Sequence, residues 1–351
     1  MMIYLSEKCI KEIIGIDMAV EAMYETFRLL ESGDFACGGK TAASHGMQLR
    51  YKKDGENALF ISMPGYAGGK YQISGVKWHG PMNSRLGGSQ ESRFTMVLND
   101  AYNGTPLCIM NADEITALRT AAVNIVAAQE LAPENATALG IIGPGRINTI
   151  TAAGILKKNP GISKVYVKGR GKKSLETFVS SIGKDFKDVK IIEVDQLKEL
   201  VLNSDIISMM TGFQFDDITE MPNIRDRWID RGVLFICGSF AFFSDTTLTR
   251  NINRVCDMFG MYESYEEELG YPAYHALSNL GNKFADLVIE NRISREQVTD
   301  IGDVINDRSI IDRTLPTLFS SGGIVIEDLV FGKIIYDHAV ENGLGIRLDG
   351  E

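Results

Sequence analysis

A glycine turn after an apolar strand is the feature of this sequence that most clearly carries chemistry. The segment Gly143-Pro-Gly-Arg-Ile-Asn148 follows an apolar run that ends at Ile142, and a helical pattern begins within it. The first glycine allows a tight turn, and the second lets the backbone approach a pyrophosphate at the amino end of a helix. Asn148 stands where a third glycine or alanine is usual, which predicts slightly looser packing of strand and helix. We therefore expect a dinucleotide site at Gly143 and Gly145.

The segment after the second expected strand indicates which dinucleotide binds. Sites that prefer NAD place an Asp or Glu at the end of this strand, on the ribose 2′-hydroxyl. Here the strand at residues 164–167 is followed by Lys168-Gly-Arg-Gly-Lys-Lys173, which has several cations and no acid. Arg170 can stack on adenine and bind a 2′-phosphate, and Lys173 adds positive charge. The segment predicts a preference for NADP(H), with NAD(H) possible. The alternative is a solvated surface turn.

Alternating strands and helices position this site. After Pro133 the chain shows apolar, strand-like runs separated by helix-length segments, at residues 137–142, 164–167, 189–193, 205–210, 233–237 and 254–258. Near-continuous apolar strands are typical of a parallel sheet with helices on both faces. We predict an α/β fold in which this part forms a doubly wound Rossmann sheet.

The chain before and after this alternation has a different pattern. We expect an amphipathic helix at residues 14–32, strands at 58–63, 73–78, 94–98 and 106–110, and a helix capped by Asn111. A long helix at residues 324–342 is expected to return to this part of the chain. The pattern predicts a second, α+β domain.

Composition excludes several classes of protein. The chain has 351 residues, 44% of them hydrophobic and 23% charged, and a net charge of −10. This balance is typical of a soluble globular protein, and the lack of a basic excess argues against nucleic acid as a partner. We expect no membrane association, because no apolar run is long enough to span a bilayer and the amino terminus does not resemble a signal peptide. The five cysteines show no paired spacing and the four histidines no ligand spacing, which predicts reduced thiols in the cytoplasm and no metal.

Several segments together resemble the ornithine cyclodeaminase/mu-crystallin family. They are Met63-Pro-Gly-Tyr66, Gly75-Val-Lys-Trp78, Leu118-Arg-Thr-Ala-Ala122, the glycine turn, and Ser321-Gly-Gly-Ile-Val-Ile-Glu-Asp328. Residues 73–80 and 97–100 are especially similar to the opine-type dehydrogenases of the diaminopropionate pathway. The resemblance implies a substrate-binding and dimerisation domain at residues 1–120 and 310–351, a Rossmann domain at residues 121–309, and a homodimer built through the sheet of the first domain.

The resemblance also implies the site residues. Lys77 and Arg119 match residues that hold a substrate carboxylate, which suits a point charge and a fork-shaped guanidinium. Arg50, or less closely Lys40, matches a third carboxylate-binding cation. The remaining matches surround the cofactor: Arg146 and Ile147 offer backbone amides to the pyrophosphate, Thr211, Cys237 and Gly238 follow the fourth and fifth strands, and Ser321 and Gly322 face the nicotinamide.

One departure from the family pattern bears on the reaction. Cyclodeaminases carry an aspartate that assists proton transfer where this chain has Phe240, and Asp245 lies five residues further on. A phenylalanine accepts no proton, so we expect an NAD(P)-dependent dehydrogenase acting on the C–N bond of a carboxylate-bearing amino acid or imine. The alternatives are a cyclodeaminase that releases ammonia and a non-catalytic, mu-crystallin-like binder of NADP(H). Lys77 and His79 are the candidates for proton transfer, and Phe240 is expected to contact the substrate.

Overall fold

The computed structural model describes residues 2–53, 55–82, 93–211, 221–229 and 231–348. The chain forms two compact units, which are treated separately below. Unit 1 comprises Met1–Arg119 and Gly323–Glu351, and unit 2 comprises Thr120–Gly322.

Unit 2 is built on an eight-stranded sheet in which every neighbouring pair is parallel. In spatial order its strands are β10 (Lys190–Glu193), β9 (Lys164–Lys168), β8 (Ala138–Ile142), β11 (Ile206–Met209), β13 (Leu234–Cys237), β17 (Thr317–Ser320), β15 (Asn253–Cys256) and β16 (Val298–Asp300). The central strands β8, β11, β13 and β17 are buried along their whole length, as expected when both faces are covered. The predicted α/β class with a parallel, Rossmann-like sheet is therefore confirmed.

The helices of unit 2 connect these strands. They are α4 (Arg146–Lys158), α5 (Lys172–Asp185), α6 (Leu197–Asn203), α7 (Asp245–Thr249), α8 (Phe259–Leu269), α9 (Ala273–Ala276), α10 (Leu280–Ile289) and α11 (Ile301–Asn306). The short strands β12 (Asn223–Ile224) and β14 (Phe242–Phe243) pair with each other beside the main sheet.

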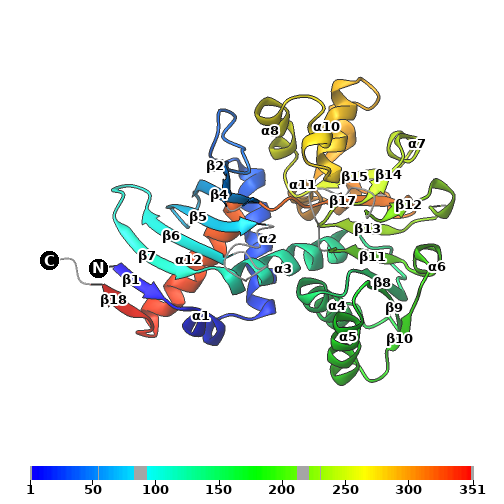
Figure 1. Ribbon diagram of the computed structural model, residues 1–351, viewed down its shortest axis with the longest axis horizontal. Helices are drawn as coiled ribbons and strands as arrows, with labels where there is room; N and C mark the ends of the chain where they lie inside the picture. The colour runs from blue at the N-terminus through cyan, green and yellow to red at the C-terminus, as the bar shows by residue number, and fades with distance from the viewer. Residues whose placement is uncertain (1, 54, 83–92, 212–220, 230, 349–351) are drawn as a thin grey trace. The chain divides into compact units, whose positions relative to one another are not determined.

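The chain leaves unit 2 only after strand β17, because this strand belongs to the unit 2 sheet. It lies between β13 and β15 in the sheet, as Figure 1 shows, although it follows them by many residues in sequence. The chain consequently returns to unit 1 after Gly322, later than the expected boundary between residues 309 and 310.

Unit 1 contains a second eight-stranded sheet with mixed directions. The order along the sheet is β18 (Ile346–Leu348), β1 (Met2–Leu5), β7 (Pro106–Asn111), β6 (Arg93–Asp100), β5 (Ile73–Met82), β4 (Glu56–Ala67) and β2 (Phe35–Cys37), and β3 (Met47–Lys53) also pairs with β4. Only the β1–β7 pair is parallel among these strands. The helices of this unit are α1 (Glu7–Ile13), α2 (Ile16–Ser32) and α12 (Val325–Glu341), and α3 (Asp113–Leu131) begins in it.

Helix α12 packs closely on β4 and β5, as Figure 1 shows. Glycines allow this approach: a Cβ atom on Gly65 would lie 2.5 Å from Val325 Cγ1, and one on Gly75 would lie 2.7 Å from Leu329 Cδ2. The carboxyl-terminal helix therefore completes the core of the first domain. Within the described part of the chain, we find no helix that is both long and apolar enough to span a membrane.

Candidate active site

The glycine turn joins β8 to α4 in unit 2. Gly143 has a φ of +83°, and a Cβ atom there would collide with the carbonyl oxygen of Met210. Gly145 is the N-cap of α4, and a Cβ atom on it would meet nothing within 4 Å. The first turn of α4 contains no acidic residue, and its N-cap has no side-chain hydrogen bond. The residues present thus fit a phosphate group, which needs open space and donor N–H groups at a helix amino end.

Asn148 is fully buried beneath this turn. Its side-chain amide lies 3.1 Å from the carbonyl oxygen of Ile142, 3.0 Å from that of Gly143 and 3.2 Å from that of Ser208. The Ser208 hydroxyl donates to Asn148 Oδ1 at 2.6 Å. Hydrogen bonds thus hold the longer side chain at the position where a glycine would allow close contact.

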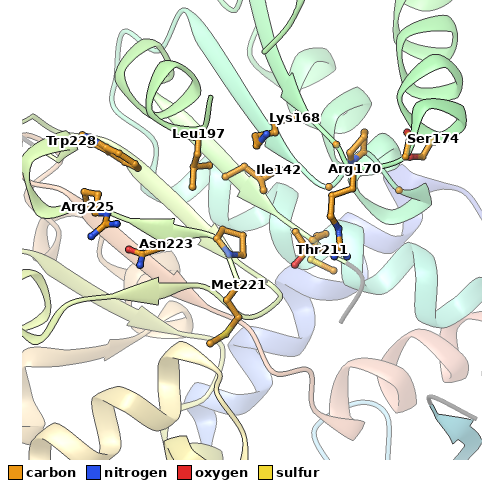
Figure 2. Close-up of a pocket in the computed structure, with 17 residues that line it drawn as sticks. Ile142, Lys168, Arg170, Ser174, Leu197, Thr211, Met221, Asn223, Arg225 and Trp228 are labelled. Carbon is orange, nitrogen blue, oxygen red and sulfur yellow. The ribbon is translucent and has the colours of Figure 1, made fainter. Parts of the chain in front are cut away.

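A cavity of about 600 Å³ lies at the carboxyl ends of β8, β9 and β11. This volume is typical of a small-molecule or cofactor site. Figure 2 shows Arg170 and Ser174 on one side of the cavity and Arg225 and Trp228 on the other. The described lining residues are Ile142, Gly143, Pro144, Gly145, Lys168, Gly169, Arg170, Gly171, Ser174, Leu197, Met210, Thr211, Met221, Pro222, Asn223, Arg225 and Trp228.

The sequence identified only part of this lining. Gly143, Gly145, Arg170 and Thr211 were expected there, whereas the wall after β11 from Met221 to Trp228 was not. The sequence gives little indication of this wall, because residues 221–229 show only a short apolar pattern and the strand β12 has two residues. The indole Nε1 of Trp228 is buried and has no hydrogen-bond partner among the described residues.

The cations after β9 differ in their surroundings. Arg170 lines the cavity. Lys168 also lines it, but its ammonium donates to the backbone oxygen of Asp195 at 2.6 Å. Lys173 is exposed in the first turn of α5 and is not among the lining residues, whereas Ser174 is. Among the cations after β9, Arg170 is therefore the one best placed to contact a ligand in this cavity.

Further expected residues lie where β11, β13 and β17 end. The Ser239 hydroxyl lies 3.0 Å from the Thr211 backbone nitrogen and 3.2 Å from the Thr211 hydroxyl. Burial raises the pKa of the Cys237 thiol far above its usual range, so this cysteine is not a thiolate. Ser321 donates its N–H to the carbonyl of Cys237 at 3.3 Å.

Close packing fixes the two glycines at these strand ends. A Cβ atom on Gly238 would collide with the sulfur of Met210. The N–H of Gly322 donates to the buried carboxylate of Asp257 at 2.8 Å, which holds the loop after β17 in place. These contacts lie within unit 2, as do Arg146 and Ile147 in the first turn of α4.

The segment after β13 offers no replacement for a catalytic aspartate. Phe240 is half-buried, and Phe243 packs its ring edge-on against Phe235 at 5.4 Å. The Asp245 carboxylate accepts from Lys283 at 3.0 Å and from Arg292. Although burial alone would raise the pKa of Asp245, the hydrogen bonds from Lys283 and Arg292 lower it. Asp245 is therefore an ionised, paired carboxylate.

Unit 1 contains a buried cluster of four charged side chains. Lys77, on β5, is 1% exposed and bonds through its ammonium to the carboxylate of Asp328 on α12. Arg119, on α3, is 8% exposed. Its Nε donates to Asp328 Oδ1 at 3.2 Å and its Nη1 donates to Glu327 Oε2 at 2.7 Å. Two cations thus face two acids, and the cluster is neutral when all four are ionised.

Burial sets the protonation of Lys77. Desolvation lowers the pKa of this ammonium to about 8, and the charge of Asp328 opposes the shift. Burial alone would raise the pKa of Asp328, but the charges of Arg119 and Lys77 lower it below the usual range. At neutral pH the lysine is protonated and close to its titration.

His79 lies two residues further along β5, on the same face as Lys77. Its ring stacks on Phe94 with 4.7 Å between ring centroids, and its Nδ1 has no hydrogen-bond partner among the described residues. Burial, followed by the charge of Lys77, lowers the pKa of His79 to about 3. The imidazole is therefore neutral at neutral pH.

Arg50 lies apart from this cluster. It is exposed on β3, where its guanidinium donates to Gln48 Oε1 at 3.0 and 2.6 Å. Arg50 pairs with Leu59 of β4, whereas Lys77 pairs with Met63 of the same strand. The two cations therefore face the same side of the sheet, separated by roughly 13 Å along β4.

Glu327 and Asp328 are site residues that the sequence analysis did not single out. They belonged to the motif at residues 321–328, but no role was assigned to them. A signal was present, because both acids lie in an otherwise apolar stretch from Ile324 to Phe331. Two acids on a helix that must be buried require cationic partners.

The described residues contain no cluster of three or more histidine, cysteine or acidic side chains that could hold a metal ion.

Comparisons with known proteins agree with this architecture. An N-((2S)-2-amino-2-carboxyethyl)-L-glutamate dehydrogenase of Staphylococcus aureus is 24% identical over 361 residues, covering 99% of this chain and 98% of the relative. The solved structure of Thermococcus litoralis Δ1-pyrroline-2-carboxylate reductase in complex with NADH and L-proline gives a TM-score of 0.76 at 22% identity, covering 99% of this chain and 100% of that one. An archaeal alanine dehydrogenase dimer with bound NAD gives a TM-score of 0.75 at 20% identity, covering 100% and 99%.

At these identities, the two solved structures show a shared fold. The sequence profile of the ornithine cyclodeaminase/mu-crystallin family extends the comparison to residues 2–343. The expected resemblance is confirmed, and the chain belongs to the ornithine cyclodeaminase/mu-crystallin family.

Proposed function

We propose that this protein is a pyridine-nucleotide-dependent oxidoreductase that acts on the C–N bond of an amino acid or imine bearing a carboxylate. The observation that carries the proposal is the pair of buried cations, Lys77 and Arg119, in unit 1. Cations are rarely buried without a function or a partner, and a guanidinium beside an ammonium suits a carboxylate. The proposed reaction also needs a dinucleotide site, and the glycine turn and the cavity of unit 2 support one.

Each set of residues has a distinct task in this proposal. Gly143, Gly145 and the first amides of α4 bind the pyrophosphate. Lys77 and Arg119 bind the substrate carboxylate and so orient the adjacent carbon. When bound, the nicotinamide supplies or accepts the hydride. Arg50, Phe240, Gly322 and the residues at the ends of β11, β13 and β17 remain predicted contacts.

Lys77 is the better candidate for proton transfer. Its pKa of about 8 allows it to gain and lose a proton near neutral pH, whereas the pKa of about 3 keeps His79 neutral. In the reducing direction, the Lys77 ammonium would donate a proton to the imine nitrogen as the adjacent carbon accepts a hydride.

We propose a preference for NADP(H) over NAD(H). The support is the absence of an acid in residues 168–173 together with the position of Arg170 at the cavity. The related solved structures hold NADH and NAD. Turnover must therefore be measured with NAD(H) as well as with NADP(H).

We also propose a homodimer that forms through the outward face of the unit 1 sheet. Aromatic side chains line this face in a row: the ring centroids of Tyr51 and Phe60 are 6.3 Å apart, and those of Phe60 and Trp78 are 5.3 Å apart. Trp78 is 40% exposed, and exposed aromatic rows are typical of interfaces. Light scattering during gel filtration should give a dimer for the native chain and a monomer for Trp78→Asp.

A reducing compartment, the cytoplasm, is the proposed location. All five cysteines are free thiols, and four of them are buried. Unpaired thiols are typical of proteins that fold in a reducing environment.

The decisive experiment is a screen of amino acids and of 2-oxo-acid and amine pairs. Absorbance at the reduced nicotinamide band should be followed with NADPH and NADH in separate reactions. The proposal expects stoichiometric nucleotide turnover with at least one carboxylate-bearing substrate, and Arg119→Ala should abolish turnover while retaining nucleotide binding. Normal kinetics in that variant would disprove the carboxylate assignment.

The same screen separates the alternative functions. A cyclodeaminase would release ammonia without net change in nucleotide, and Phe240 argues against it because it replaces the proton-accepting aspartate. A non-catalytic binder would hold NADP(H) tightly and turn over nothing.

A further inference from the structure

We propose that Asp328 is a positioning residue for substrate binding, whose single carboxylate fixes Lys77 and Arg119 in the arrangement that receives a substrate carboxylate. The inference rests on the proposed function and names a residue that acts through the two cations. It predicts that Lys77 and Arg119 both lose their positions when Asp328 is substituted.

The two oxygens of Asp328 bind different cations. Oδ2 accepts from the Lys77 ammonium, and Oδ1 accepts from the Arg119 Nε at 3.2 Å. The three residues come from β5, α3 and α12, far apart in sequence. One planar carboxylate therefore sets the spacing of the two cations.

Burial makes this arrangement rigid. Asp328 is 0% exposed and Lys77 is 1% exposed, so neither charge can turn to water if the bond is lost. Removing one partner from a buried ion pair leaves an uncompensated charge, which is far more costly than losing an exposed pair. The helix that carries Asp328 is itself fixed on β4 and β5 by the close glycine contacts described above.

Lys77 keeps donors for a ligand while bound to Asp328. An ammonium has three N–H groups, and the bond to Asp328 uses one of them. The acid thus orients the lysine without occupying its whole binding capacity. The same bond stabilises the ammonium against the desolvation that lowers its pKa.

The charges around Lys77 distinguish Asp328 from its neighbour Glu327. Four ionisable groups face the ammonium: Asp328 and Glu327 on α12, Arg119 on α3, and His79 on β5. The effect of Asp328 is the largest of the charge effects on Lys77, and that of Glu327 is the smallest of those resolved. Glu327 bonds to Arg119, so the two adjacent acids form a matched pair of test positions.

The test compares Asp328→Asn with Glu327→Gln in the full chain. Both changes remove one negative charge and keep the side-chain shape. The titration of Lys77 is read by NMR of the protein labelled with ¹³C at lysine Cε, with Lys77→Arg identifying the signal. Asp328→Asn should lower the Lys77 pKa by roughly one unit or more, and Glu327→Gln should shift it by less than half as much.

Kinetics test the positioning role. With the substrate found in the screen, Asp328→Asn should raise KM about ten-fold or more, while the Kd for the nucleotide stays within about two-fold of the native value. A change that only loosened the fold would instead lower the melting temperature without moving the Lys77 titration.

Asp328→Glu covers the case in which the asparagine variant does not fold. The charge is kept and the carboxylate moves by one methylene, so Lys77 should titrate near its native pKa while KM still rises. The proposal is overturned if Asp328→Asn leaves the Lys77 titration unchanged, if Glu327→Gln shifts it equally, or if Asp328→Glu retains the native KM. The titration needs no substrate, so a protein without turnover would refute the proposed function and still decide the role of Asp328.

Discussion

Ser208 and Asn148 join the glycine turn to the neighbouring strand through a hydrogen bond of 2.6 Å between their side chains. The Asn148 amide also lies within hydrogen-bonding distance of three backbone carbonyls, in β8, in the turn and in β11. An asparagine at the third position of the glycine motif thus connects three segments that a glycine could connect only by close contact.

Asn148→Ala should destabilise unit 2 and weaken nucleotide binding. The substitution leaves buried carbonyls without their donor, which costs about 1–3 kcal/mol for each unsatisfied group. Urea denaturation should show a loss of this order, and the nucleotide Kd, measured by titration calorimetry, should rise because the turn is no longer held.

Thr149→Ala is the matched control. Thr149 is the next residue of α4, and its hydroxyl donates to the Gly145 carbonyl at 2.9 Å in an exposed position. Loss of an exposed bond should change stability by less than about 0.5 kcal/mol. Equal effects of the two variants would mean that the buried network contributes nothing specific.

The Rossmann strands could be predicted because most are short apolar runs separated by turns and helix-length segments. Five of the six expected ranges match β8, β9, β10, β11 and β13 to within a residue at each end, and the sixth is shifted to β15. Strand β17 was missed although its four residues are all buried, because it directly precedes the helix pattern at the carboxyl end and follows no strand–helix alternation in the sequence. Its place between β13 and β15 depends on tertiary pairing, which local sequence does not encode.

The charged cluster could be predicted only in part. Lys77 and Arg119 follow from the family motifs, whereas their pairing with Asp328 and Glu327 joins residues more than 200 positions apart. A sequence indicates that acids in an apolar helix need partners, but which partners depends on how α12 lies on β5. The pKa of Lys77 depends on the same packing, so local sequence does not determine it.

Arg170→Ala should weaken the binding of NADPH far more than the binding of NADH. If Arg170 binds the 2′-phosphate, its loss removes charge-assisted hydrogen bonds of roughly 1.5–3 kcal/mol, or about 10–100-fold in Kd for NADPH. The Kd for NADH should change by less than about three-fold, because NADH lacks that phosphate. Both constants can be measured by nicotinamide fluorescence.

Lys172→Ala provides the control for loss of charge alone. Lys172 lies two residues away, is exposed, and faces Glu176 at 3.8 Å. Its removal should affect both nucleotides slightly and equally. If Arg170→Ala weakened NADPH and NADH to the same extent, the preference for NADP(H) would lose its basis.

The pH dependence should follow Lys77. Because burial lowers the pKa of Lys77 to about 8, its ammonium is present below that pH and is lost above it. Both carboxylate binding and proton donation require the ammonium, so kcat/KM for the reducing reaction should fall as the pH rises through about 8. In Lys77→Arg the guanidinium stays charged, so any remaining activity should lack this alkaline limb.

His79→Phe tests the competing assignment. The neutral imidazole already stacks on Phe94, and its Nδ1 has no hydrogen-bond partner among the described residues, so a phenyl ring should fit with little loss. The alkaline limb should stay where it is, because the imidazole carries no charge near pH 8. Loss of turnover in His79→Phe with an intact fold would assign proton transfer to the histidine instead.

Gly323→Ala should impair substrate binding by displacing Arg119. Gly323 has a φ of +78°, and a Cβ atom there would lie 2.6 Å from Arg119 Nη1. The guanidinium cannot move freely, because Asp328 and Glu327 hold it in a buried position. We expect KM to rise about ten-fold, with nucleotide affinity retained because the substitution lies in unit 1.

Gly33→Ala is the control that measures only the loss of stability from placing an alanine at a positive φ. Gly33 has a φ of +74°, and a Cβ atom on it would meet nothing within 4 Å. Both variants should lose roughly 1–2 kcal/mol of stability from the left-handed backbone conformation, but only Gly323→Ala should alter KM, because only Gly323 touches the carboxylate-binding arginine. A native KM in Gly323→Ala, with the expected loss of stability, would show that the position of Arg119 is not critical for substrate binding.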